Sequence, residues 1–352
     1  PHISQDSLTL IANPLDLNPQ QLQAVTAQPG PSLVLAGAGT GKTKVLTRRA
    51  AWLIAHGIHP AHILLITFTK KAAGEMLRRV QEVNPFPTQK IQGGTFHSMA
   101  NSWLRQHGHA IKLHSTFTLM DESDAGSMLH LLASKLHLTR IKGFPDKRTL
   151  MSLFGLASNS LTPIETTLEH EFPQYSAHTA TILNLHRQFV DAKWTQQRFD
   201  YDDLLLLVHR LLTEEPHAAQ ALTAQYQALL VDEYQDTTRL QAELVRALAA
   251  PHNNIMVVGD DLQSIYRFRG ADVRNMEEFV HLFERPLIYK LEHNYRSTQP
   301  ILQLANCLIA QTHSPHTKSL FTTKTTGPRP QLVECQDEHQ QSIYLINQIR
   351  AL

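Results

Sequence analysis

The chain has 352 residues, which is enough for two or three domains with buried cores, and its composition is that of a globular protein. Its formal net charge of +1 excludes a general affinity for polyanions, so any contact with nucleic acid must come from a local groove. The 21 histidines lack metal-ligand spacing, and the two cysteines, Cys307 and Cys335, form no CxxC motif, so neither a metal cluster nor a disulfide framework is expected.

Residues 1–14 are expected to form an N-terminal tail. Short β-type runs then alternate with helical patterns over residues 15–108 and 199–285, which predicts an α/β fold with a parallel sheet and crossover helices. The predicted strands are Leu33–Ala36, Ile63–Thr67, Lys90–Gly93, Ala228–Asp232 and Ile255–Gly259. The predicted helices are Lys42 to about His56, Lys70–Val80, Phe96–His107 and Thr237–Ala249.

The rhythm changes over residues 109–198, where strand signals vanish and Leu-rich helical segments are broken by glycine and proline. We interpret this stretch as a helical insertion into the sheet domain. After Arg285-Pro286 a second unit is expected over residues 286–352, made of strand Leu287–Leu291, helix Gln299–Ala310, strand Gln331–Cys335 and helix Asp337–Leu352. The sequence stops inside this last helix without a cap, and we therefore expect a truncated chain.

No leader or anchor is apparent. The N-terminal residues lack a basic segment followed by an apolar one, and the longest apolar run, near Leu204 to Val208, is too short to cross a bilayer. The low cysteine content fits a reducing compartment. We expect a cytoplasmic protein without a membrane partner.

The run Ala36–Thr43 follows the first strand and reads AGAGTGKT. A strand, a glycine turn, Lys-Thr and a helix form the arrangement that wraps backbone N–H groups around a triphosphate. Lys42 can reach the β- and γ-phosphates, and Thr43 offers a hydroxyl to Mg²⁺. Ala36 replaces the first glycine of the strict pattern. The alternative is a glycine-rich strand-to-helix turn without a ligand.

Two acids, Asp232 and Glu233, end the apolar strand that begins at Ala228. In a nucleotide site, Asp232 would hold Mg²⁺ and Glu233 would orient and deprotonate the attacking water. The alternative is a strand end with two solvated acids. A glycine turn upstream in the same sheet favours the first interpretation.

The last strand of the predicted sheet runs into a polar and aromatic loop at residues 260–270. The amide of Gln263 can sense a γ-phosphate, while Tyr266, Phe268 and Arg269 have the aromatic and basic character that stacks bases and holds phosphates. The alternative is that Tyr266 and Phe268 are core residues.

Taken together, the chain resembles the UvrD/Rep/PcrA family of superfamily 1 DNA helicases along nearly its whole length. Eight blocks match the family's motifs in order: Leu17–Val25 (the Q motif), Gly37–Thr43 (I), Ile66–Met76 (Ia), Gly94–Met99 (Ib), Phe199–Leu204 (the short motif before II), Asp232–Asp236 (II), Gln263–Asp272 (III) and Asn294–Thr298 (IV). The resemblance implies a RecA-like P-loop domain with a helical insertion and the beginning of a second RecA-like domain.

The resemblance also implies roles for individual residues. Those expected to act in catalysis are Glu233, Lys42, Gln263 and Arg296. Those expected to bind ATP are Gln21, Ala38, Gly39, Thr40, Gly41, Lys42, Thr43, Lys44, Tyr295 and Arg296. Thr43 and Asp232 are expected to hold Mg²⁺. The residues expected to contact single-stranded DNA are Phe68, Thr95, His97, Tyr266, Phe268 and Arg269.

Several of these residues have structural alternatives. Phe68 can be a core phenylalanine, and His97 can supply a helix-start hydrogen bond. For Asp202 and Asp203 we favour a structural role, as acids at a helix start whose charge suits the dipole.

The chain departs from the family pattern at three places. Lys44 stands where the family usually has Arg, and Lys lacks the planar face that can flank adenine. Phe268 stands where Trp is common, and its smaller ring would stack more weakly. Motifs V and VI are not found before Leu352, so the second-domain arginine that supplies charge to the nucleotide is expected to be Arg296 alone.

We therefore expect an ATP-driven translocase that moves 3′→5′ on single-stranded DNA and unwinds duplex at single-strand/duplex junctions, here as a weakly active piece. In the expected cycle ATP lies between two sheet domains, held by Lys42 from one and Arg296 from the other. Repair or replication proteins would load it. The alternatives are an ATP-gated regulatory module that does not unwind, and a non-helicase P-loop NTPase such as a kinase.

Overall fold

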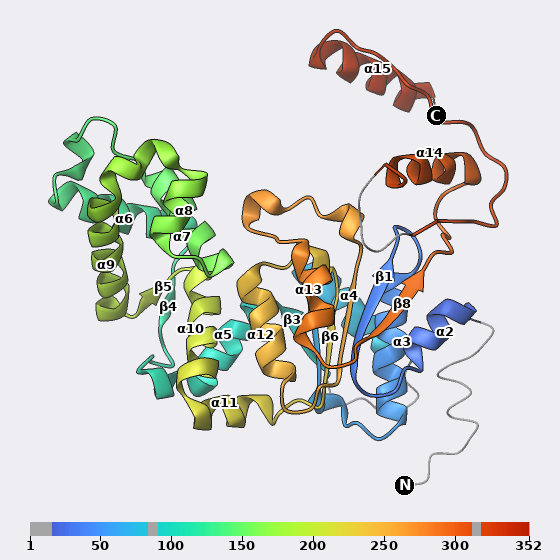
Figure 1. Ribbon diagram of the computed structural model, residues 1–352, viewed down its shortest axis with the longest axis horizontal. Coiled ribbons are helices and arrows are strands. Elements are labelled where there is room, and N and C mark those ends of the chain that lie inside the picture. Colours follow the sequence, from blue (N-terminus) through green and yellow to red (C-terminus); the bar gives the residue numbers. More distant parts are fainter. Residues whose placement is uncertain (1–15, 84–90, 312–317, 352) are drawn as a thin grey trace. The chain divides into compact units, whose positions relative to one another are not determined.

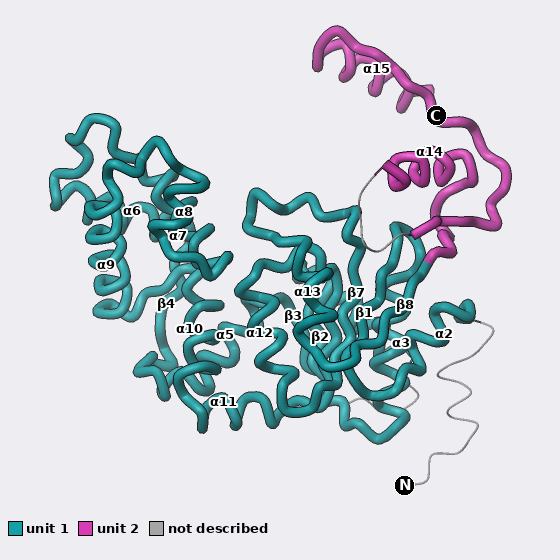
Figure 2. Tube along the Cα trace, in the orientation of Figure 1, with its two compact units in different colours: residues 1–291 teal, residues 292–352 magenta. Residues whose placement is uncertain are grey.

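The computed structural model describes residues 16–83, 91–311 and 318–351. The chain divides into two compact units, residues 1–291 and residues 292–352, which Figure 2 shows in different colours. The predicted tail over residues 1–14 lies outside the described residues, as do Lys90 and Leu352, the ends of one predicted strand and of one predicted helix.

The first unit is built on a six-stranded sheet in the order β3-β2-β6-β7-β1-β8, in which all neighbours pair in parallel. Its strands are β1 (Pro31–Ala36), β2 (Ile63–Thr67), β3 (Gln92–Thr95), β6 (Ala228–Val231), β7 (Ile255–Gly259) and β8 (Leu287–Leu291). The predicted α/β class is confirmed. Because parallel strands need crossover connections, helices lie between most of them in the sequence (Figure 1).

Helices cover both faces of this sheet, which is why its strands are apolar on both sides. Along β1, Leu33 and Leu35 enter one core cluster, while Val34 and Ala36 enter the other. The helices that contribute to the first cluster are α5 (Phe96–His107), α10 (Tyr201–Glu214), α11 (Pro216–Thr223), α12 (Arg239–Ala249) and α13 (Arg274–Leu282). Those on the other face are α2 (Pro19–Val25), α3 (Lys42–Ala55) and α4 (Lys70–Val83).

The stretch predicted as a helical insertion forms a lobe with its own apolar core (Figure 1). Its helices are α6 (Glu122–Lys135), α7 (Lys147–Ser160), α8 (Ile164–Glu171) and α9 (Thr179–Gln196). No strand is predicted here, yet the chain enters and leaves the lobe through a short parallel pair, β4 (Thr118–Leu119) and β5 (Arg198–Phe199). Among the described residues, no helix is both long and apolar enough to span a membrane.

Strand β8 pairs with β1 at the edge of the first sheet, where Leu287 and Ile288 are half exposed. The predicted boundary at Arg285-Pro286 assigns this strand to the start of the second unit. In the structure the backbone N–H of Gly37 also donates to the carbonyl of Leu291, so the end of β8 is tied to the glycine turn.

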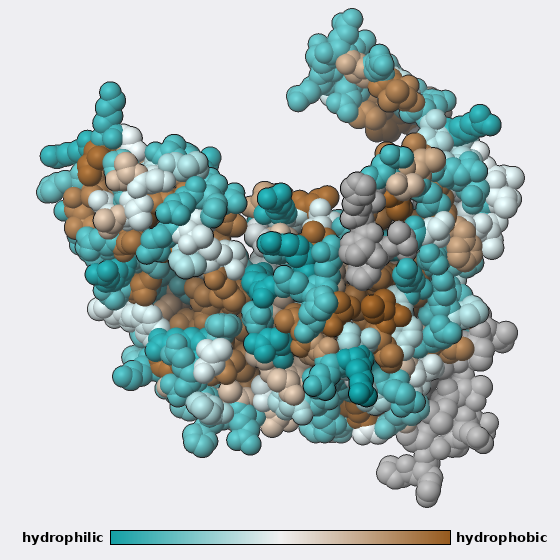
Figure 3. All heavy atoms as spheres, in the orientation of Figure 1, coloured by the Kyte–Doolittle hydropathy of each residue, from teal (hydrophilic) through white to brown (hydrophobic). Residues whose placement is uncertain are grey.

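The second unit contains α14 (Gln299–Ile309) and α15 (Glu338–Ala351). The predicted strand Gln331–Cys335 is wrong: these residues form no strand, and most of them are exposed. None of the described strands pairs with them. Apolar side chains on both helices are exposed, and Figure 3 shows them as brown surface on the two segments. They are Ile301, Leu304, Leu308, Ile343, Leu345, Ile346 and Ile349.

A buried ion cluster joins the last helix of the insertion to the sheet body. The Lys193 ammonium in α9 lies 3.1 Å from Asp200 and 2.6 Å from Asp203, and all three side chains are largely buried. Asp200 also caps α10 in a reciprocal capping box with Asp203. Burial raises the pKa of Asp203 to about 7, although Lys193 opposes the shift. The stability of this buried cluster therefore depends on the positive charge of Lys193.

We predict that Lys193→Met lowers the free energy of unfolding by about 3–5 kcal/mol at pH 8, because it leaves two buried carboxylates without a cation. The loss should be smaller at pH 5.5, since the raised pKa of Asp203 lets the folded state take up a proton that relieves the repulsion. Urea unfolding at the two pH values measures both effects. The control is Arg198→Met, whose exposed guanidinium lies 4.0 Å from Asp124 and should contribute little. Equal losses for the two variants would contradict the prediction.

Candidate functional site

The glycine turn that follows β1 has the backbone shape of an anion cradle. Gly39 and Gly41 have φ values of 70° and 88°, a region that residues with a Cβ rarely adopt. The Thr40 hydroxyl donates to the carbonyl of Gly37 over 2.8 Å and closes the turn. Gly41 is the N-cap of α3, so Lys42 and Thr43 lie in the first helical turn, where backbone N–H groups point out of the helix. Ala38 is half-buried on the same turn.

Gln21, expected to read adenine, holds the glycine turn in this structure. Its Nε2 donates to the carbonyl of Thr40 over 2.8 Å, and its Oε1 accepts from the backbone N–H of Asn18 over 3.1 Å. A Cβ at position 41 would stand 2.8 Å from the Gln21 amide, so Gly41 is required by close packing as well as by its φ. Lys44, expected beside adenine, pairs with the Asp16 carboxylate over 2.7 Å.

The two acids after β6 lie next to the lysine of the glycine turn. The Lys42 ammonium is 2.6 Å from Oε2 of Glu233, although the two residues are 191 positions apart in the sequence. Parallel strands bring them together, because β1 and β6 both border β7 and end at the same edge of the sheet. Glu233 has φ 51° and ψ 46°, a left-handed conformation that costs a non-glycine residue of order 1–3 kcal/mol. Such strain points to a functional position.

Burial raises the pKa of Asp232 to about 7, with repulsion from Glu233 adding to the shift and Lys42 opposing it. Burial likewise raises the pKa of Asp236 to about 6, again with a contribution from Glu233. Three carboxyl groups therefore share one nearby ammonium. Positive charge brought to this loop would stabilise all three.

These residues fit Mg²⁺, which proteins usually hold through one or two carboxylates together with substrate phosphates. Asp232 is 6% exposed, and Oδ1 of Asp236 is buried with no hydrogen-bond partner. Among the described residues, no group of three His, Cys, Asp or Glu side chains could hold a metal by itself. The donor set thus suits a cation that arrives with phosphate.

Gln235 is a further residue of the site, and none of the expectations from the sequence includes it. Its side chain is 1% exposed and bonds both Glu233 and the end of β7. Its sequence position inside the acidic motif gave no hint of this, since the second partner, Asp260, is 25 residues away. Gln263, the expected γ-phosphate sensor, donates from Nε2 to the Asp260 carboxylate over 2.6 Å.

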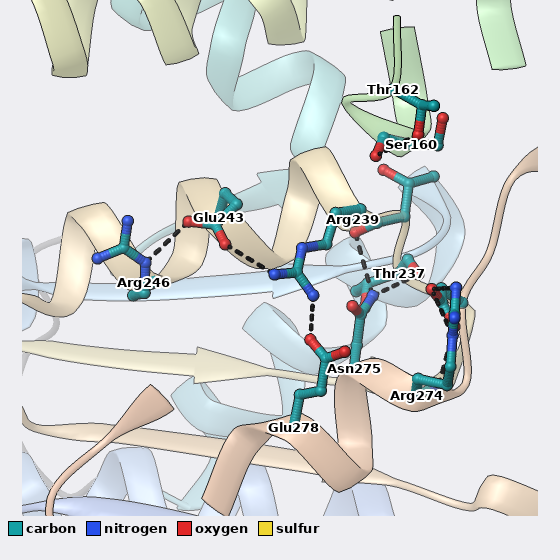
Figure 4. A network of polar contacts seen from close by, with 11 residues as sticks. Ser160, Thr162, Thr237, Arg239, Glu243, Arg246, Arg274, Asn275 and Glu278 are labelled. Atoms are coloured by element: carbon teal, nitrogen blue, oxygen red, sulfur yellow. Dashed lines mark hydrogen bonds and ion pairs between the residues drawn. The ribbon is translucent and has the colours of Figure 1, made fainter. Parts of the chain in front are cut away.

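The segment after the acids is anchored by a polar network that Figure 4 shows from close by. The buried amide of Asn275 donates to the carbonyl of Thr237 over 2.9 Å, and Arg239 pairs with Glu278. The backbone N–H of Asp272 donates to the same Thr237 carbonyl over 3.0 Å. The segment that follows Asp232–Asp236 (residues that we call the acidic loop) and the end of the 260–270 loop are therefore held by the same hydrogen-bond network.

An aromatic row lies on the loop after β7. The Tyr266 ring lies 4.9 Å from Phe68 and 6.0 Å from Phe268, and the Arg269 guanidinium is 5.8 Å from the Tyr266 ring. Phe268 is 80% exposed, so the alternative that it is a core residue is wrong. Phe68 and Tyr266 are half-buried. A row of rings that is open to solvent at Phe268 and lies beside a cation is what base stacking requires.

Thr95 and His97 lie at the start of α5. The Thr95 hydroxyl is the N-cap and accepts from the backbone N–H of Ser98 over 3.2 Å, so this residue has a structural task. The His97 ring lies 5.9 Å from Tyr201, and burial lowers its pKa, with Arg269 contributing and Asp202 opposing. His97 therefore favours the neutral ring.

Asp202 and Asp203 are confirmed as helix-start acids. Asp203 completes the capping box of α10 and pairs with Lys193, while Asp202 accepts a hydrogen bond of 2.9 Å from Asn159.

In the second unit, the Tyr295 ring is half exposed and lies 4.3 Å from His293. The Asn294 side chain accepts from the backbone N–H groups of Arg296 and Ser297. The Arg296 side chain is exposed.

Comparison with known proteins agrees with this geometry. A model of the UvrD/REP helicase N-terminal domain matches residues 17–284, and a model of the UvrD-like helicase C-terminal domain matches residues 289–352. The chain belongs to the UvrD/Rep helicase family. The resemblance drawn from the motifs is thereby confirmed, and the parallel α/β sheet is consistent with the RecA-type fold of this family.

Relatives include the ATP-dependent DNA helicase PcrA of Staphylococcus epidermidis, 33% identical over 336 residues, and that of Staphylococcus aureus, 33% identical over 334 residues. Each match covers 95% of this chain and 45% of the relative. The chain therefore spans about half the length of the curated relatives it matches.

We predict that Glu233→Gln lowers the pKa of Asp232 below 7, because it removes the repulsive charge next to that carboxyl. The measurement is an NMR titration of side-chain carboxyl carbons, with Asp232→Asn to assign the resonance. The control is Glu243→Gln, which removes an equal charge from an ion pair with Arg239 in α12. If the pKa of Asp232 stays near 7 in Glu233→Gln, the prediction is wrong and burial alone accounts for the raised pKa.

Proposed function

We propose that this chain carries the ATP-hydrolysing and DNA-gripping machinery of a DNA helicase of the UvrD/Rep family. The observation that carries the proposal is the 2.6 Å ion pair between Lys42 and Glu233 at the mouth of the glycine turn. A lysine placed for phosphate and an acid placed for water are held in contact there, in a backbone shaped for a triphosphate.

In the proposed reaction, the phosphates of ATP draw Lys42 away from Glu233 and take its charge for themselves. Glu233 then accepts a proton from water as the water oxygen attacks the γ-phosphorus, and ADP leaves with the electrons of the broken P–O bond. Thr43 and Asp232 would hold Mg²⁺, which supplies positive charge to the phosphate oxygens. Gln263 would sense the γ-phosphate, and Tyr295 and Arg296 are proposed as further nucleotide-binding residues.

The exposed aromatic row supports single-stranded DNA as the track. Bases would stack on Phe68, Tyr266 and Phe268, and Arg269 would meet a phosphate. Thr95 and His97 are proposed to contact the same strand from the start of α5. The net charge of +1 means that this grip depends on local stacking more than on the charge of the whole chain.

The finer assignments follow from the family and remain proposals. They are 3′→5′ translocation, action at single-strand/duplex junctions, service in DNA repair or replication with loading proteins as partners, and a cytoplasmic location. The PcrA relatives from which they are drawn are about twice as long as this chain.

We predict that the chain binds Mg²⁺-ATP and that Lys42→Met weakens this binding at least tenfold, because a charge on the phosphates is lost. Glu233→Gln should keep the binding and lower single-turnover hydrolysis by about 10²–10⁴-fold, the range of a lost general base. A fluorescent ATP analogue measures binding, and quenched-flow assays with oligo-dT measure hydrolysis.

Two outcomes would count against this proposal. Absence of nucleotide binding in the wild-type chain would overturn the site itself. Nucleotide binding with no difference in hydrolysis between wild type and Glu233→Gln would favour the ATP-gated module over the motor.

We predict that Phe268→Ala weakens oligo-dT binding about fivefold or more, since stacking on one ring contributes ~1–3 kcal/mol. Folding should be unaffected, because this ring is 80% exposed. The control is Ile265→Ala, in the same loop and 72% exposed, which removes apolar surface without a ring. Fluorescence anisotropy measures both affinities, and equal effects would argue against stacking.

A further inference from the structure

A single buried amide connects the proposed catalytic acid to the loop that carries the aromatic row. Gln235 lies on the one-turn helix after Glu233 and is 1% exposed. Its Nε2 donates to Oε2 of Glu233 over 2.9 Å, and its Oε1 accepts from the backbone N–H of Asp260 over 3.0 Å. The two ends of one amide thus bond the ends of two neighbouring strands, β6 and β7.

The first of these bonds uses an oxygen that is shared. Oε2 of Glu233 accepts from Gln235 and also from the Lys42 ammonium, at 2.6 Å. When Lys42 turns to a phosphate, that oxygen loses its charged partner and keeps the amide. The strength of the hydrogen bond from Gln235 to Glu233 therefore depends on whether the nucleotide site is occupied. If Glu233 contacted Lys42 alone, this change would not reach a third residue.

The second bond is held in a tight space. A Cβ built on Gly259 would stand 2.7 Å from Oε1 of Gln235, so only glycine lets this oxygen reach the backbone at the end of β7. The Ser264 hydroxyl also donates to the carbonyl of Gln235, over 3.3 Å. Residue 235 thus meets the loop at two places, before and after Gln263.

From Asp260 the connection runs to Gln263 and then to the aromatic row. The backbone N–H of Gln263 donates to the carbonyl of Asp260 over 2.9 Å, and its side chain donates to the Asp260 carboxylate over 2.6 Å. Tyr266, three residues further on, contacts Phe68. All of these groups lie within the first unit.

We propose that Gln235 is the positioning residue through which nucleotide binding changes the affinity of the aromatic loop for single-stranded DNA. The inference rests on the proposed function and deepens it, because it assigns the communication between the two proposed sites to a buried residue outside the sets proposed to bind ATP and DNA. The connection is the Gln235 amide, which is hydrogen-bonded to Glu233 and to the backbone of Asp260. Glu233 gains or loses its ion pair with Lys42 when the nucleotide leaves or binds.

The test is a thermodynamic coupling measured on the full 352-residue chain. Oligo-dT affinity is measured by anisotropy without nucleotide and with saturating Mg²⁺ and a non-hydrolysable ATP analogue, and the ratio of the two dissociation constants is the coupling. We expect a ratio of about fivefold or more in the wild type, at the lower end of common allosteric couplings. In Gln235→Met, which keeps the length of the side chain and removes its hydrogen bonds to Glu233, to Asp236 and to the Asp260 N–H, we expect the ratio to fall below about twofold.

A second variant and a matched control separate coupling from folding. Gln235→Glu keeps an acceptor for the Asp260 N–H and places a carboxylate against Glu233, so it should also lose the coupling. The control is Gln241→Met: Gln241 is likewise buried, and its amide oxygen accepts from the Thr238 backbone N–H in the cap of α12. It should lose stability, measured as a lower thermal midpoint, and keep the wild-type ratio.

The outcomes are distinguishable. A wild-type chain that binds neither ligand contradicts the proposed function. A wild-type chain that binds both with a ratio near one, or a Gln235→Met chain that keeps the wild-type ratio, overturns the role of Gln235 while leaving the proposed function standing. A ratio that falls equally in Gln235→Met and Gln241→Met would assign a structural role to both residues and would also overturn it.

Discussion

The ion pair between Lys42 and Glu233 is the interaction on which the rest of the site depends. It joins the glycine turn after β1 to the acids after β6, and it supplies an ammonium that offsets the charge of three clustered carboxyl groups. In the proposed reaction, phosphate competes for the same ammonium. Nucleotide binding would therefore change the net charge around Asp232, Glu233 and Asp236.

The acidic loop is held firmly enough for such a change to have an effect. Glu233 adopts a left-handed backbone, which the surrounding structure must stabilise. The Asn275 amide and the Arg239–Glu278 pair fix the segment that follows, and Gln235 bonds the loop to β7. Because the loop is fixed at both ends, loss of the Lys42 charge would act mainly on the side-chain contacts that Lys42 shares. The Glu233 oxygen, which also accepts from Gln235, makes such a contact.

The helical insertion meets the same body through polar contacts. The buried ion cluster around Lys193 connects α9, the last helix of the insertion, to the start of α10. Asn159 of α7 donates a hydrogen bond to Asp202, also at the start of α10. A Cβ on Gly270, at the end of the aromatic loop, would stand 3.2 Å from Cβ of Asn159. The insertion thus packs against the loop proposed to hold DNA.

The sequence by itself determined the local elements and the residues of each motif, because strand runs, helix periods and the glycine turn are written in neighbouring positions. It placed Ile63–Thr67 and Ile255–Gly259 at their observed bounds, and it named Lys42, Asp232 and Glu233 as a set. The prediction of strand Gln331–Cys335 is wrong because a strand forms only where another strand pairs with it, and none of the described strands pairs with this segment. The tertiary structure alone decided that Gln21 holds the turn, that Lys193 meets two aspartates and that Gln235 joins Glu233 to Asp260. A hydrogen bond between distant positions depends on how strands are ordered in the sheet, and no single stretch of sequence contains that order.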